Sequence, residues 1–90
     1  MDIEFDEEKR QQTLEHRGLD FHDSTLVFQQ RTITLTDDRT AYGETRIQTI
    51  GLLNGRIVMV VWTPRGEARR IISMRKCNAR EQYKYRELLD

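Results

Sequence analysis

The chain has 90 residues, of which 37% are apolar and 33% are charged, and its only cysteine is Cys77. This length fits one domain, so residues 1–90 are predicted to form a single unit with a small core. A single cysteine excludes an internal disulfide, and the longest apolar run, residues 57–62, is too short to cross a bilayer. The acidic N-terminus carries no visible secretory signal, so we expect a cytoplasmic protein.

Charge is distributed unevenly along the chain, although the formal net charge is zero. Residues 1–45 carry five basic and eleven acidic side chains, whereas residues 46–90 carry ten basic and four acidic ones. Twelve of the fifteen basic residues are arginines, whose planar guanidinium binds phosphate or carboxylate bidentately. The pattern favours an oxyanion-binding face in the second half of the chain. An ordinary solvated charged surface is the alternative.

Two helices are predicted in the first third of the chain. Asp6 is suited to cap the first helix, which ends at Gly18. The second helix is shorter and has either Asp20 or Asp23 as its cap. Its buried face is predicted to consist of three consecutive apolar residues: Leu26, Val27 and Phe28.

Four strands are predicted next, over residues 31–36, 46–53, 57–62 and 68–74. The first alternates apolar residues with threonines, which is typical of a half-buried strand. Asn54 and Gly55 favour a tight type I′ turn between the second and third strands. Residues 57–62 are apolar at every position, so we expect a central strand that is covered on both faces. Residues 37–43 and 63–66 are predicted to be turns or loops.

A last helix is predicted over residues 79–89, because Asn78 and Glu81 have the spacing of a capping box. The predicted fold class is therefore α+β: two N-terminal helices, a four-stranded antiparallel sheet and a C-terminal helix.

Five segments, in this order, carry a family resemblance. They are FDEEK (5–9), TLEHRGLDF (13–21), DDR (37–39), YGETR (42–46) and RIISMRK (70–76). Their order and spacing resemble the BrnT family of toxins over almost the whole chain. The chain departs from the family pattern in two respects. Phe5 stands where the family usually has Trp. The family's Lys–His pair before the glycine is replaced by His16 and Arg17, which moves the histidine by about 100° around a helix.

The resemblance implies a RelE-like fold and a ribonuclease toxin of a type II toxin–antitoxin pair. Such a toxin would cleave RNA without a metal or other cofactor and so inhibit translation. The implied partner is a BrnA-type antitoxin, whose ribbon-helix-helix domain binds operator DNA, and the implied assembly is a dimer of toxin–antitoxin heterodimers. No membrane partner is predicted, because the longest apolar run is too short to cross a bilayer.

Arg70 and Arg75 are the predicted ligands of the scissile phosphate. Residues five apart on a regular strand point to opposite faces, so a bulge must intervene if both act. Arg69 has the same parity as Arg75 and is the substitute. The alternative is that these arginines are structural and pair with Glu44 or Glu67.

Three further residues are predicted to take part in catalysis. Glu44 is a candidate general base or an orienting group for Arg39 or Arg46, and a salt bridge to Arg46 is the structural alternative. Lys9 and His16 are seven residues apart, so they lie on one helix face and could frame a phosphate or acid site. Their alternative role is that of exposed polar residues. The remaining predicted RNA-binding residues are basic: Arg17, Arg39, Arg46, Arg69, Lys76 and Arg80.

No metal site is predicted, because His16 and His22 stand outside any ligand-spaced cluster. A non-enzymatic module that binds an antitoxin and acts as a co-repressor is the rival interpretation, since the displaced histidine would suit decayed catalysis. A third, weaker interpretation is an inhibitor that cuts RNA only on the ribosome.

Overall fold

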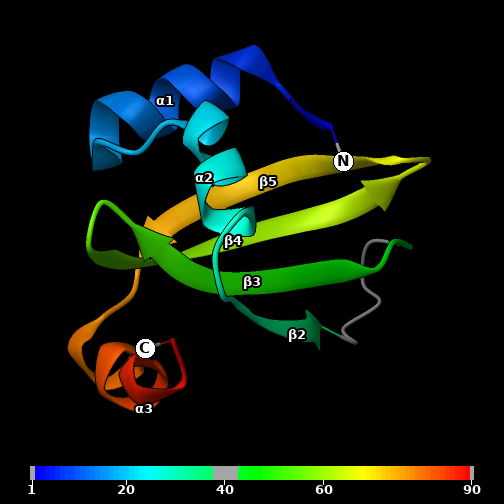
Figure 1. Cartoon of the computed structure of the whole chain (residues 1–90). Coiled ribbons are helices and arrows are strands. Elements are labelled where there is room, and N and C mark those ends of the chain that lie inside the picture. Colours follow the sequence, from blue (N-terminus) through cyan, green and yellow to red (C-terminus); the bar gives the residue numbers. More distant parts are fainter. Residues whose placement is uncertain (1, 38–42, 90) are drawn as a thin grey trace.

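The computed structural model describes residues 2–37 and 43–89 (Figure 1). In chain order, these residues form β1 (Ile3–Phe5), α1 (Glu7–Arg17), the 3-10 helix η1 (Phe21–Asp23), α2 (Ser24–Phe28), β2 (Ile33–Asp37), β3 (Arg46–Leu53), β4 (Arg56–Arg65), β5 (Ala68–Lys76) and α3 (Ala79–Leu89). The predicted α+β class is confirmed.

The sheet differs from the prediction in one strand. Over the described residues it has five strands in the order β1-β5-β4-β3-β2. β1 runs parallel to β5, and the other neighbours are antiparallel. The prediction of four strands, all antiparallel, is therefore wrong. Three residues are too few to show a period of two, and a parallel partner 66 positions away leaves no local signal in the sequence.

β4 is the central strand, and both of its faces are covered as predicted. Val58, Val60 and Trp62 pack beneath η1 and α2 on one face, which we call the η1/α2 face. Ile57 and Met59 pack beneath α3 on the opposite face, which we call the α3 face. Figure 1 shows α3 well apart from α1 and α2. The core is therefore two thin layers on either side of one sheet.

The caps of the first helices follow the sequence. The Asp6 carboxylate accepts hydrogen bonds from the backbone N–H groups of Glu8 and Lys9, and Gly18 ends α1 with a φ of 68°. Of the two predicted caps of the second helix, Asp20 accepts a hydrogen bond from the backbone N–H of His22 at the start of η1, whereas Asp23 precedes α2 without a side-chain cap hydrogen bond.

The predicted buried face of α2 is wrong for one residue. Val27 is fully buried and Phe28 is half-buried, but Leu26 is 45% exposed. Three consecutive helical residues span about 200° of the helix surface, so they cannot all face one sheet.

The hairpin between β3 and β4 forms as predicted, with positive φ angles at Asn54 (52°) and Gly55 (81°). β4, however, continues through the predicted turn as far as Arg65, and the chain turns at Gly66, whose φ is 56°. Pro64 is tolerated in this strand because it lies near the strand end and is exposed.

A buried hydrogen bond links β3 to β4. The indole Nε1–H of Trp62 donates to Oγ1 of Thr49 over 2.8 Å, and Thr49 is 1% exposed. Thr49→Val is expected to lower the free energy of unfolding by about 1–3 kcal/mol, because the buried indole N–H loses its acceptor. Urea denaturation measures this change.

Thr34→Val is the matched control. The Thr34 hydroxyl lies 3.3 Å from that of Thr49, and its removal leaves the Trp62 bond intact. Equal destabilisation by the two substitutions would contradict a special role for the Trp62–Thr49 bond.

Candidate functional site

A β-bulge brings Arg70 and Arg75 to the same face of β5. The register against β4 shifts by one residue at Ile72. As a result, Arg70 lies opposite Thr63 and Arg75 lies opposite Met59, and these two β4 residues share one face. This is the bulge that the sequence required if both arginines were to act together.

The same bulge puts Arg69 on the η1/α2 face. Its guanidinium lies 4.0 Å from the ring centroid of Phe28 and 5.2 Å from that of Trp62, a cation–π arrangement on that face. The expectation that Arg69 shares a face with Arg75 is therefore wrong. The extra residue Ile72 reverses the alternation of β5, so Arg69 and Arg75 point to opposite faces.

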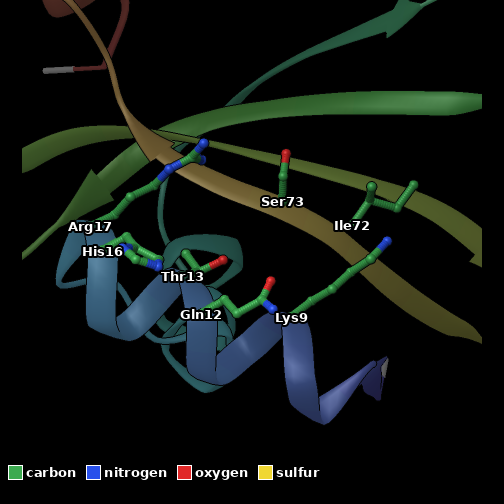
Figure 2. A pocket seen from close by; sticks show the side chains of 7 residues that line it. All are labelled: Lys9, Gln12, Thr13, His16, Arg17, Ile72 and Ser73. Carbon is green, nitrogen blue, oxygen red and sulfur yellow. The ribbon is translucent and has the colours of Figure 1, made fainter.

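A groove of about 360 Å³ lies between α1 and β5 (Figure 2). α1 contributes a stripe of polar residues, and β5 contributes the bulge: Lys9, Gln12, Thr13, His16, Arg17, Ile72 and Ser73 line the groove. Lys9 and His16 therefore share a helix face, as predicted. In Figure 2 the side chains of Lys9 and Arg17 extend toward β5.

The groove and the two arginines are adjacent in the fold. Ile72 and Ser73, which line the groove, lie between Arg70 and Arg75 on β5. On the sheet, α3 packs over β2 and β3. Both arginines therefore lie on the α3 face of the sheet at its β5 end, beside the strands that α3 covers. They are only partly buried, with the side chain of Arg70 33% exposed and that of Arg75 40% exposed.

Each of these arginines already has a carboxylate partner. Nη1 of Arg70 lies 3.5 Å from Oε1 of Glu4 on β1. Nη1 and Nη2 of Arg75 donate to Oε1 and Oε2 of Glu81 on α3, both at 2.8 Å. The partners are therefore Glu4 and Glu81, where the sequence suggested Glu44 or Glu67. The capping-box spacing predicted that Glu81 lies at the start of the last helix, but no pattern in the sequence predicted its contact with Arg75.

The other predicted residues are dispersed. Glu44 forms the 3.7 Å ion pair with Arg46 that was its structural alternative. Arg17 lines the groove and also donates from Nη1 to the backbone carbonyl of Met74 over 2.8 Å. That carbonyl belongs to the part of β5 that follows Ile71, where β1 no longer pairs with β5.

Three predicted RNA-binding residues remain. Lys76 and Arg80 are exposed near the junction of β5 and α3, outside the residues that line the groove. Arg39 lies outside the described residues. The structure thus brings together Lys9, His16 and Arg17, with Arg70 and Arg75 flanking the same stretch of β5.

The ion pair of Arg75 and Glu81 shifts the pKa values of both side chains. The Arg75 guanidinium, helped by the backbone N–H of Asn78, lowers the pKa of Glu81 from 4.5 to about 2. The pKa of Arg75 is raised, chiefly by its hydrogen bonds to Glu81. Glu81 is therefore ionised throughout the physiological range.

This pair predicts a pH dependence of stability. A carboxyl group whose pKa is lower in the folded state stabilises the fold above its unfolded pKa, here 4.5, and loses that contribution as the pH falls toward about 2. The loss is expected to be about 1–2 kcal/mol after allowance for solvent screening. Chemical denaturation of the wild type and Glu81→Gln between these pH values measures it. The same pH dependence of the free energy of unfolding in the two proteins would contradict the prediction.

Among residues 2–37 and 43–89, no three His, Cys, Asp or Glu side chains gather closely enough to hold a metal ion. The helices of that part of the chain are all too short or too polar to cross a membrane.

The fold and the site define a small α+β protein with cationic side chains around a groove beside one sheet edge. The family model for the ribonuclease toxin BrnT of the type II toxin–antitoxin system matches residues 5–81, and the chain belongs to this family. A comparison with curated proteins gives no match. Membership confirms the resemblance of the five sequence segments and implies an antitoxin as partner.

Proposed function

We propose that this chain is an endoribonuclease that cleaves RNA without a metal ion and thereby inhibits translation. The observation that carries the proposal is the bulge at Ile72, because it gives Arg70 and Arg75 a common face on either side of the groove-lining residues. Two guanidinium groups on one face are suited to bind the phosphate oxygens of RNA, whose charge increases during cleavage.

The proposed reaction uses the 2′-hydroxyl of the RNA as nucleophile. The 2′-oxygen bonds to phosphorus, and the bond from phosphorus to the 5′-oxygen breaks. One group removes the 2′-proton and another protonates the leaving 5′-oxygen. Lys9 and His16 line the groove and are the candidates for these transfers. Arg70 and Arg75 would stabilise the additional negative charge on the phosphate.

Glu44 has a lesser place in this proposal. Its carboxylate pairs with Arg46 on β3, and β4 separates β3 from β5, the strand that lines the groove. We therefore assign Glu44 to orienting Arg46, one of the two roles that the sequence suggested.

The proposed partner is a BrnA-type antitoxin with a ribbon-helix-helix domain. The chain would reach operator DNA only through that antitoxin, in a dimer of toxin–antitoxin heterodimers. The order of α1 and α2 before strands β2–β5, and of α3 after them, supports the RelE-like fold that the resemblance implies.

The test incubates the purified chain with a mixed-sequence RNA in excess EDTA, and in parallel with translating ribosomes. Cleavage of free RNA in EDTA is the expected result. Cleavage that requires an added divalent ion would contradict metal independence. Cleavage only on ribosomes would favour the ribosome-dependent alternative.

A non-enzymatic, antitoxin-binding co-repressor is the second candidate. The observation that favours it is that Arg70 and Arg75 already pair with Glu4 and Glu81. An intact RNA substrate under both conditions, together with a stable complex with the antitoxin, would support this candidate.

A further inference from the structure

We infer that Glu81 is a positioning residue that holds the guanidinium of Arg75 in place for the phosphate. This inference rests on the proposed ribonuclease function and adds a residue from α3 to the site.

The contact between the two side chains is fully bidentate. Both η nitrogens of Arg75 donate to the two carboxylate oxygens of Glu81 at 2.8 Å. Nη2 also lies 3.4 Å from Sδ of Met59, so the sheet supports the guanidinium from beneath. A flexible arginine is thereby restricted to one orientation, and this lowers the entropy that substrate binding would otherwise cost.

Glu81 is itself held rigidly at the start of α3. Its Oε1 accepts the backbone N–H of Asn78 over 2.9 Å, and Oδ1 of Asn78 accepts the backbone N–H of Glu81 over 2.8 Å. This is a complete capping box. The backbone N–H of buried Cys77, the residue before Asn78, donates to the backbone carbonyl of Ile57 on β4 over 2.9 Å, and buried Tyr85 anchors the helix on the sheet. Arg75 is therefore positioned by the helix and the sheet together.

The bound guanidinium still has capacity for substrate. An arginine has five N–H donors. The Glu81 carboxylate takes two of them, and the Lys76 carbonyl oxygen and Sδ of Met59 take two more in weak contacts of 3.4 Å. The Nε–H and these two weakly bound donors are open to a phosphate, since the side chain of Arg75 is 40% exposed. The carboxylate also places a negative charge beside the path of an anionic substrate. Positioning should therefore favour the chemical step while the carboxylate weakens RNA binding, and these two effects can be separated by kinetics.

The test compares single-turnover cleavage by the wild type and Glu81→Gln over a range of enzyme concentrations. Glutamine serves at this position of a capping box, so the helix start is retained while the ionic clamp is lost. We expect the maximal rate to fall by about tenfold to a hundredfold, because small displacements of a catalytic group cost this much. We also expect the RNA concentration dependence to shift toward tighter binding. A residue with a purely structural role would not produce this split.

Two further variants complete the experiment. Glu87→Gln removes the same charge from an exposed position of α3 and should change the maximal rate little. In the background of Arg75→Ala, Glu81→Gln should cause no additional loss, because Glu81 acts through Arg75.

The outcomes separate the inference from the proposed function. A wild type that cleaves RNA beside an equally fast or faster Glu81→Gln overturns the inference alone, and a faster variant would identify the pair as inhibitory. A wild type that cleaves RNA under no condition overturns the proposed function and the inference with it.

Discussion

Replacing Arg70 with alanine is expected to lower the rate of RNA cleavage by about 10²–10³-fold. Its guanidinium is fixed on the β5 side of the α3 face by the direct pairing of β1 and β5 and by the Glu4 carboxylate. Preorganised donors of this kind lose no energy to reorganisation during the reaction, and removal of one typically has this effect. Single-turnover cleavage at saturating enzyme measures the change.

Arg69→Ala is the matched control for this prediction. Arg69 is adjacent in sequence but lies on the opposite face, over Phe28 and Trp62. Its loss should reduce stability through the missing cation–π packing and leave the cleavage rate near that of the wild type. Wild-type cleavage by folded Arg70→Ala, or an equal loss in Arg69→Ala, would contradict the site.

Replacing Phe21 with alanine is expected to lower the free energy of unfolding by about 3–5 kcal/mol. Phe21 is fully buried in the cluster beneath η1 and α2, and its ring packs edge-on against Phe5, with centroids 5.9 Å apart. This change is a large share of the total stability of a small domain, which is on the order of 5–15 kcal/mol. Urea denaturation followed by circular dichroism measures it.

Leu26→Ala tests whether burial causes that effect. Leu26 lies on α2 close to Phe21 in sequence but is 45% exposed. Its truncation is expected to cost less than about 1 kcal/mol, as is usual at partly exposed positions. A loss as large as that of Phe21→Ala would show that α2 packs differently.

The two candidate phosphate ligands depend on the two ends of the described fold. Glu4 reaches Arg70 from β1, and Glu81 reaches Arg75 from α3. The central sheet alone would present both arginines on one face but would leave their orientation free. A partner that displaces β1 or α3 would therefore disturb the site without touching the groove.

Local signals in the sequence determined most of the elements. Asp6 and Gly18 delimit α1, and Asn54 and Gly55 define the β3–β4 turn, because caps and tight turns depend on a few neighbouring residues. The uniformly apolar run in β4 predicted a strand covered on both faces, since burial on both sides removes the alternation. The ordered family segments predicted the toxin family, and the family model confirms it.

The tertiary structure alone decided how the site is assembled. β1 forms only because β5 offers it an edge, and the bulge at Ile72 arises where β5 is matched against β4. That single extra residue decides that Arg70, and not Arg69, shares a face with Arg75. The carboxylate partners of both arginines come from separate elements. Contacts between residues distant in the chain have no period or motif, so they become visible only once the sheet has brought them together.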